Sequence, residues 1–294
     1  MKYAWIGQHS DSYSVALMCE VLEVSKSGYY DSLDREPSPR AQRRERIQAA
    51  VREVHAQSHE IYGSYKIAQQ LKQHEHLEGA CRNTVATAMR KMGLKSKVVR
   101  AFTPNTTKAD PNKQPAPNKF DRDFTAPAPN RKWVTDITYL PTTEGWVYLA
   151  VVLDLFSRKV VGWSLGPSLA TELVSAALQR AIEARRPEGK QLLHHSDRGC
   201  QYTSDAYQTI LRMLGIDCSM SRTGECYDNA VMERFFWSLK HEWTNHETFP
   251  NLQHAQRSVF KYIETFYNSQ RIHQTLNYKT PNQFEAEYAP ANAA

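Results

Sequence analysis

Residues 133–140 read Trp-Val-Thr-Asp-Ile-Thr-Tyr-Leu, and residues 146–153 read Trp-Val-Tyr-Leu-Ala-Val-Val-Leu. The first stretch alternates along its length, which predicts a β-strand. The second is almost continuously apolar, as in a sheet covered on both faces. Asp136 interrupts the first strand at its centre. A carboxylate in an apolar strand costs free energy to bury unless it is paired or binds a metal, so Asp136 is a candidate functional residue.

The segments that follow predict the fold class. A turn at 154–158 leads into a third strand at 159–165, and a helix is expected over 171–185. Further strands are expected at 192–195 and 216–220, and further helices at 204–214, 228–243 and 252–267. The order β-β-β-α-β-α-β-α-α is that of a ribonuclease-H-like fold. We therefore expect an α/β domain with a mixed sheet flanked by helices.

The composition excludes a disordered chain and a disulfide-stapled one. The chain has 294 residues, and 31 of them are aromatic (Trp 6, Tyr 15, Phe 10). Its length suggests two domains. No apolar run reaches the roughly 18–20 residues of a membrane span, and residues 1–11 show no secretory signal. Five cysteines without a C-x-x-C pair fit a reducing cytoplasm, where we expect the protein to act.

The positive charge is concentrated at the front of the chain. Residues 1–125 hold 20 Lys and Arg against 14 Asp and Glu, whereas residues 126–294 hold 17 of each, so the net charge of +6 belongs to the front part. A basic front part suggests a polyanion partner, most often nucleic acid. The alternative at this point is that the charge serves only solubility.

Residues 1–100 predict a helical DNA-binding region with helix-turn-helix units at about 12–33 and 60–95. Ser12 is expected to cap the first helix, and a further helix is expected over 40–57. Residues 101–130 contain six prolines, which predicts a linker before a catalytic core over 131–290.

The last helix of the front region is the expected recognition helix. Asn83 is expected to cap it and Gly93 to end it. Arg82, Asn83 and Thr84 then lie at its N-terminal end, where helix-turn-helix proteins touch base edges. The alternative is a plain helical bundle, because such caps occur in any bundle.

Three acidic residues predict a metal site. Asp197 follows a short strand and precedes Gly199, a position where α/β sheets place ligands, and Glu233 lies on an expected helix. Asp136 and Asp197 are separated by 60 residues, and Asp197 and Glu233 by 35. Two like charges 4 Å apart repel by about 4 kcal/mol at an effective dielectric of 20, and a divalent cation relieves this. Oxygen ligands favour Mg²⁺ or Mn²⁺, and two such ions suit in-line attack on a phosphodiester.

Over nearly its full length the chain resembles the second-frame (OrfB) transposases of the IS-three family of insertion sequences. The stretches that carry the resemblance are Val24–Tyr30, Tyr62–Ile67, Trp133–Tyr139, His195–Tyr202 and Tyr267–His273. The resemblance implies a retroviral-integrase-like core with a D-D-35-E triad, here Asp136, Asp197 and Glu233. It also implies that Lys240, seven residues after Glu233, meets DNA near the reacting end.

The function expected from these observations is metal-dependent DNA strand cleavage and strand transfer, on terminal inverted repeats and target DNA. The resemblance implies a first-frame (OrfA) protein as partner or fusion, assembly as a homo-oligomer on DNA, and a bacterial, nucleoid-associated location. Two rivals stay open: a structure-selective nuclease of the same fold, and a DNA-binding regulator with an inactive core.

Several further residues allow two interpretations. Arg271 and His273, expected on a late helix, either contact DNA or cover the core. His194 and His195 are adjacent in a strand and point to opposite faces, which disfavours a shared metal. Asp154 is either a fourth metal ligand or a turn former, and Asp228 is expected to cap the helix that carries Glu233.

Overall fold

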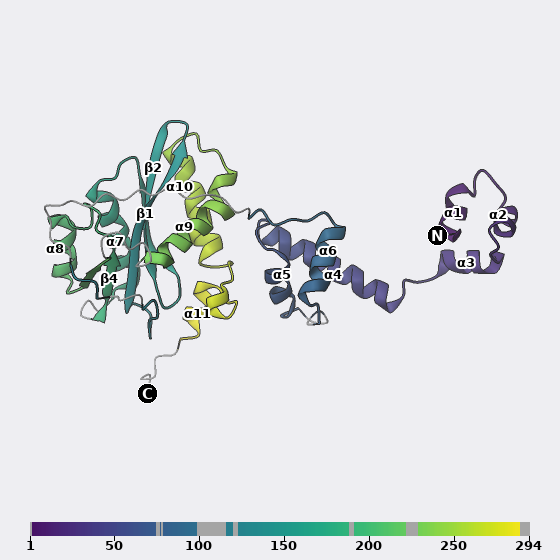
Figure 1. Ribbon diagram of the computed structural model, residues 1–294, viewed down its shortest axis with the longest axis horizontal. Coiled ribbons are helices and arrows are strands. Elements are labelled where there is room, and N and C mark those ends of the chain that lie inside the picture. The colour runs from purple at the N-terminus through teal and green to yellow at the C-terminus, as the bar shows by residue number, and fades with distance from the viewer. Residues whose placement is uncertain are drawn as a thin grey trace.

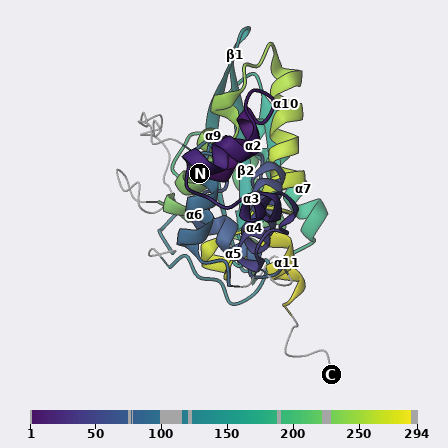
Figure 2. The same cartoon turned by 90° about the vertical axis from the view of Figure 1, so that its right-hand side faces the viewer.

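The computed structural model of the chain describes residues 2–74, 77, 79–98, 116–119, 123–187, 191–221 and 229–288. Most of the expected linker and the expected cap Asp228 lie outside these residues. Two small helical units and an α/β domain follow one another along one axis, as the two views in Figure 1 and Figure 2 show together. In the described ranges, no helix combines the length and the apolar character needed to cross a membrane.

A five-stranded sheet in the order β3-β2-β1-β4-β5 is the centre of the α/β domain. The first three strands pair antiparallel, whereas β4 pairs parallel to β1 and β5 parallel to β4. The strand bounds are β1 Lys132–Thr142, β2 Gly145–Asp154, β3 Val160–Gly166, β4 Leu193–Ser196 and β5 Asp217–Met220. This mixed sheet with flanking helices confirms the expected fold class.

Helices cover both faces of the sheet (Figure 1). Trp133 and Ala150 pack with α7 and α8, whereas their neighbours Val134 and Val151 pack with α9 and α10, as the twofold alternation of a strand requires. The helix bounds are α7 Thr171–Arg185, α8 Asp205–Met213, α9 Ala230–Glu242, α10 Leu252–Phe260, a π-helical continuation Lys261–Tyr267, and α11 Pro281–Ala286, with short 3-10 turns at Thr244–His246 and Gln274–Leu276.

Gly162 lets α7 lie close against β3. A Cβ atom at this position would come within 2.3 Å of the carbonyl oxygen of Ala177 and 2.7 Å of the Cβ of Ala181. Only a residue without a side chain fits between this strand and this helix.

The second helical unit consists of α4 (Pro39–Gln57), α5 (Ser64–Leu71) and α6 (Arg82–Lys91). The N-cap of α6 is Cys81, so the expectation that Asn83 caps this helix is wrong, and Asn83 lies in the first turn. Cys81 takes the extended backbone of a cap while Arg82 is already helical. Gly93 has a φ of +69°, which agrees with its expected place just beyond the helix.

The first helical unit consists of α1 (Lys2–His9), α2 (Val15–Val21) and α3 (Lys26–Asp34). Helix α1 was not expected, and Ser14 rather than Ser12 caps α2, accepting from the backbone N–H of Leu17 at 3.3 Å. A small core of its own holds the unit, made of Ile6, Met18, Cys19 and Tyr29. The region 1–100 therefore packs as two separate units.

The α4–α6 unit shares its hydrophobic core with the α/β domain. Tyr62 is buried at the junction, where its hydroxyl donates to the carbonyl of Gln270 (3.1 Å) and accepts from the N–H of Ile272 (2.8 Å). Burial raises the pKa of Tyr62 to about 12, so the hydroxyl keeps its proton at neutral pH. One side chain thus satisfies two backbone groups of the other domain.

We predict that Tyr62→Phe lowers the free energy of unfolding by about 1–3 kcal/mol, because it leaves the buried N–H of Ile272 without its partner and removes the hydrogen bond to the carbonyl of Gln270. Urea denaturation followed by circular dichroism measures this change. The matched control is Tyr30→Phe, because Tyr30 is 54% exposed on α3. Equal stability of the two variants would contradict the prediction.

Candidate functional site

The pairing of β1 with β4 places Asp136 beside Asp197. Val134 is the parallel partner of His195, and two steps further along each strand lead to Asp136 and Asp197. Neighbouring strands lie about 4.8 Å apart, so Asp136 within β1 and Asp197 just beyond the end of β4 lie side by side. Asp136 is two residues from Val134 and four from Leu140 along the same strand, so all three lie on one face of the sheet, the face that α9 covers.

Each of the two aspartate carboxylates accepts a short hydrogen bond from a backbone N–H group. Asp136 Oδ1 accepts from the N–H of Ile137 (2.7 Å), and Asp197 Oδ1 accepts from the N–H of Gly199 (2.9 Å). A Cβ at Gly199 would lie 3.0 Å from Asp197 Oδ1, so a larger residue would crowd this turn. Both aspartates line one cavity of about 280 Å³, together with Thr138, Tyr139, Tyr148, Leu169, Gln201 and others.

The environment of Asp136 disfavours its negative charge. Burial, followed by the neighbouring charge of Asp197, raises the pKa of Asp136 well above its ordinary value, and Glu233 adds a smaller contribution in the same direction. The N–H of Ile137 acts in the opposite sense without cancelling the rise. The close approach of the two aspartates therefore disfavours two negative charges in this cavity.

Glu233 is not gathered with the two aspartates. It is exposed on the first turn of α9 and does not line their cavity. Across the residues that the structure describes, no three His, Cys, Asp or Glu side chains lie close enough to hold one ion. Burial nevertheless raises the pKa of Glu233, and its charge acts on Asp136, so it faces the same region.

Asn229 connects the start of α9 to the strand that carries Asp136. Its Nδ2 donates to the carbonyl of Thr135 at 3.3 Å, while its buried Oδ1 lacks a hydrogen-bond partner. The residue before Asp136 and the residue four before Glu233 are thus in direct contact.

Lys240 reaches the edge of the same cavity. Its Nζ lies 4.3 Å from the centre of the Tyr139 ring, and Tyr139 lines the cavity with Asp136. Burial lowers the pKa of Lys240 from its ordinary value. An amine is therefore held against Tyr139, one of the residues that line the cavity of the two aspartates, and its contact with DNA stays a prediction.

A basic groove of about 590 Å³ runs between α4 and α6. Asn83 and Thr84 line it, whereas the exposed Arg82 stands outside it. No residue lining the groove is acidic, and its cations are Arg40, Arg43, Arg44 and Lys91. Sequence reasoning missed these four, although three arginines within the first six residues of α4 were a visible signal.

The two histidines of β4 serve separate structural contacts. His194 Nε2 lies 3.0 Å from the hydroxyl of Tyr207, and burial lowers its pKa to about 3. His195 lies between the hydroxyls of Ser219 and Ser221, at 2.9 and 3.2 Å. They point to opposite faces, as expected.

Asp154 has the geometry of a turn former. Its oxygens accept from the N–H groups of Asn130 (2.7 Å) and Phe156 (2.8 Å), and Arg185 lies 3.7 Å away. The structure therefore favours the turn interpretation over a fourth metal ligand.

Arg271 is a buried core residue and does not lie on a helix, since the π-helical segment ends at Tyr267. Its Nε and Nη2 donate to the Glu242 carboxylate at 2.6 and 2.5 Å. The ring nitrogen Nε2 of His273 lies 3.3 Å from Nη1 of Arg271, and burial and the Arg271 charge lower the pKa of His273 well below its ordinary value. Of the two interpretations left open, covering the core is the one this geometry supports.

We predict that Glu242→Gln destabilises the fold by about 3–5 kcal/mol, because it leaves the Arg271 guanidinium buried without a counter-charge. Burial alone would raise the pKa of Glu242, but Arg271 outweighs it and holds the pKa below its ordinary value. The stabilisation is therefore present at neutral pH and is lost as the pH falls through that lowered pKa.

Urea denaturation at pH 7 and at a series of pH values below 4.5, the ordinary pKa of a glutamate, measures both effects. Glu287→Gln is the control, because Glu287 pairs with Lys279 at the exposed surface, where a pair contributes at most about 1 kcal/mol. Similar losses in the two variants would show that the buried pair is unimportant.

The α/β domain and the α4–α6 unit both match known protein families. Residues 126–226 and 214–281 match families described as integrase core domain, and residues 42–102 match a family described as HTH-like domain. The transposase InsF for insertion sequence IS3A of Escherichia coli (strain K12) is 40% identical over 287 residues, which cover 97% of this chain and 98% of that protein.

Two further proteins are similar. An insertion element IS600 uncharacterized 31 kDa protein from Shigella sonnei is 39% identical over 92% of this chain and 98% of its own length. The HTLV-2 integrase catalytic core domain, solved in complex with magnesium, is 21% identical with a TM-score of 0.43, and the match covers 54% of this chain and 99% of that one. Because it is 40% identical to InsF over 97% of its length, the chain belongs to the IS3 family of insertion-sequence transposases, with an HTH-like domain followed by an integrase core.

Proposed function

We propose that Asp136, Asp197 and Glu233 are the catalytic carboxylates with which this transposase cuts and joins DNA strands. The observation that carries the proposal is the β1–β4 register, which sets two carboxylates side by side over one cavity. The intact pair also argues against a regulator with an inactive core. Strand transfer, as opposed to nuclease activity alone, follows from membership of the transposase family.

The donor atoms suit a hard divalent cation. Both aspartates offer carboxylate oxygens. Burial, followed by the charge of Asp197, raises the pKa of Asp136, and a cation would relieve the repulsion between the two carboxylates. Oxygen ligands favour Mg²⁺ or Mn²⁺. We propose that Asp136 and Asp197 hold this metal, with two ions in all. Glu233 is the third ligand in this proposal, and its exposed side chain joins the pair when metal and DNA are bound.

The chemistry divides between the metal and the chain. Divalent ions bound here supply the charge that activates the attacking oxygen and stabilises the leaving 3′-oxygen. The three carboxylates fix the place of reaction, and the Lys240 ammonium orients a phosphate next to it. Water attacks in cleavage and the freed 3′-hydroxyl attacks in joining, so no covalent bond to the protein is needed.

In this proposal, the N-terminal part of the chain recognises the DNA sequence. The groove between α4 and α6 offers four cations for phosphates, and Asn83 and Thr84 offer hydrogen bonds to base edges. Arg82, at the exposed start of α6, is placed to extend this contact. A first-frame (OrfA) protein and a second copy of this chain are the partners we expect on the DNA ends.

We predict that Asp136→Asn, Asp197→Asn and Glu233→Gln each reduce strand cleavage and joining to background, because the amides keep the shape but lose the charge that holds the metal. DNA binding in EDTA should be unchanged. A gel assay with Mn²⁺ and a duplex containing the element's end, labelled at the 5′ end of the strand whose 3′-hydroxyl is joined, measures both steps. A variant that still joins DNA at the wild-type rate would remove that residue from the site.

We further predict that Asn83→Ala lowers affinity for the element's end by about 1–3 kcal/mol and leaves affinity for a random duplex unchanged. Arg44→Gln should weaken binding to both duplexes alike, because a phosphate contact carries no sequence information. Fluorescence anisotropy at fixed salt measures these affinities. Arg90→Gln is the control, since Arg90 is exposed on α6 away from the groove. If Asn83→Ala weakens neither complex, sequence reading lies elsewhere.

A further inference from the structure

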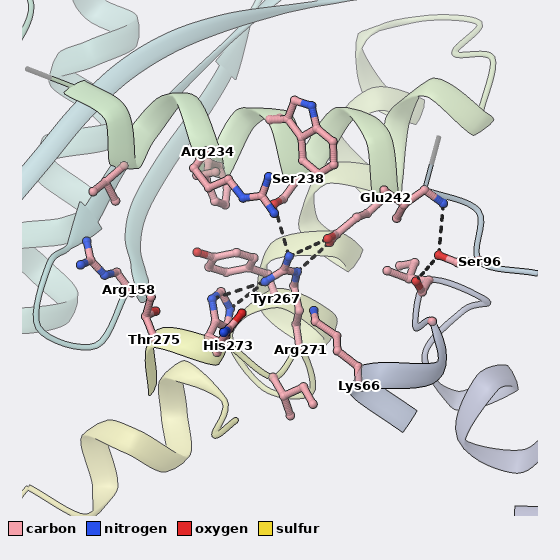
Figure 3. A pocket seen from close by; sticks show the side chains of 18 of the residues that line it. Lys66, Ser96, Arg158, Arg234, Ser238, Glu242, Tyr267, Arg271, His273 and Thr275 are labelled. Atoms are coloured by element: carbon pink, nitrogen blue, oxygen red, sulfur yellow. Dashed lines mark hydrogen bonds and ion pairs between the residues drawn. The ribbon is translucent and has the colours of Figure 1, made fainter. Parts of the chain in front are cut away.

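A second cavity, of about 550 Å³, lies where the HTH-like unit meets the integrase core, away from the paired aspartates (Figure 3). Its walls come from α5, from the turn after β2, from α9 and from the segment after the π-helix. Five of its lining residues are basic, namely Lys66, Arg158, Arg234, Arg271 and His273, and one is acidic, Glu242.

The charges in this cavity do not cancel. Glu242 is fully engaged by Arg271, and the lowered pKa of His273 keeps that ring neutral. Within the described residues, Lys66, Arg158 and Arg234 have no carboxylate partner. Lys66 Nζ lies 4.8 Å from the Tyr62 ring centre, and the Arg234 guanidinium lies 4.4 Å from that of Trp237. Burial and the Arg271 charge lower the pKa of Lys66 to about 7. The cavity therefore holds two guanidinium groups and one partly charged amine, and none of the three has an ion-pair partner among the described residues.

Arg158 shows that this arrangement is costly for the chain. Its Nη2 donates to the carbonyl of Phe124 (3.2 Å), but its Nη1 is buried and lacks a hydrogen-bond partner. Its backbone has a φ of +59°, in the left-handed region that favours glycine. A charged donor that is buried, unsatisfied and carried on unfavourable backbone is typical of a site that awaits a ligand.

The ligand class follows from charge, shape and place. A phosphodiester has several acceptor oxygens, which suits cations that converge from three elements. Arg234 directly follows Glu233 on α9, so the cavity and the proposed catalytic carboxylate occupy neighbouring faces of one helix, about 100° apart. A strand that passes the active site is thus within reach of this cavity.

We propose that the cavity between α5 and α9 binds a backbone phosphate of the DNA, held by Lys66, Arg158 and Arg234. The proposal rests on the proposed function only in that the ligand is DNA. It makes the phosphate a bridge between the HTH-like unit, through Lys66, and the helix that carries Glu233. DNA bound there would add a contact to the shared core that already joins the two domains.

Salt dependence of DNA binding tests the proposal on the full chain. A fluorescein-labelled duplex is titrated in EDTA at 50–200 mM salt with the wild type and with Lys66→Gln, Arg158→Gln and Arg234→Gln. Each lost phosphate contact lowers the log–log salt slope by about 0.9, so a variant should lose about 3.5-fold less affinity than the wild type across this range. Arg158→Lys keeps the charge and should keep the wild-type slope.

Arg257→Gln is the control, because Arg257 is exposed on α10 and outside the cavity. Wild-type slopes for all three cavity variants, with folding verified by circular dichroism, would overturn the proposal. Calorimetric titration with inorganic phosphate separates a free anion from DNA. Tight phosphate binding that the variants abolish while their DNA slopes stay unchanged would also overturn it.

The slope is measured without metal, so it does not depend on catalysis. An inactive wild type whose cavity variants show reduced slopes would contradict the proposed function and support the cavity site. An active wild type whose variants keep the full slope would do the reverse.

Discussion

The parallel pairing of β1 with β4 is the constraint on which the site depends. Asp136 and Asp197 are far apart in the sequence, and only the register Val134–His195 brings them side by side. A slip of one residue would turn one carboxylate to the opposite face of the sheet. On its other side, the buried contacts of His195 with Ser219 and Ser221, on and beside β5, hold β4 against β5. The juxtaposition of the two proposed catalytic aspartates is therefore a property of strand pairing.

The second constraint lies under α9. Glu242 at the end of this helix is clamped by Arg271, and Asn229 at its start is tied to Thr135 beside Asp136. The same region receives the HTH-like unit through Tyr62, which contacts the backbone on both sides of Arg271. The helix that carries Glu233 is thus anchored at both ends, and DNA-reading and catalytic parts share one core.

Local patterns predicted much of this architecture. The helix Thr171–Arg185 begins and ends where its apolar period and the flanking residues indicated, and the strands agree within one or two residues. Helix α1 was missed because eight residues with a glycine near the end carry little amphipathic signal. The N-cap of α6 was misplaced because Asn83 is a residue type that commonly caps helices, whereas Cys81, which does cap this helix, is not.

Long-range contacts were beyond the reach of local patterns. The hydrogen bond between Tyr62 and Ile272 joins residues 210 apart, and nothing near either residue signals the other. For the same reason Arg271 could be placed either on DNA or in the core until its partner Glu242 was located. The aspartate pair was predictable because a carboxylate inside an apolar strand is costly wherever the strand packs.

The central claim is that the carboxylates on β1, β4 and α9 hold metal at one point. Iron-mediated cleavage tests it directly, because Fe²⁺ with peroxide and ascorbate releases hydroxyl radicals that cut the backbone next to a bound ion. On the full chain with DNA, the account predicts cuts near residues 136, 197 and 233 that excess Mg²⁺ suppresses. Cuts confined to other segments, or none above those of free Fe²⁺, would contradict it.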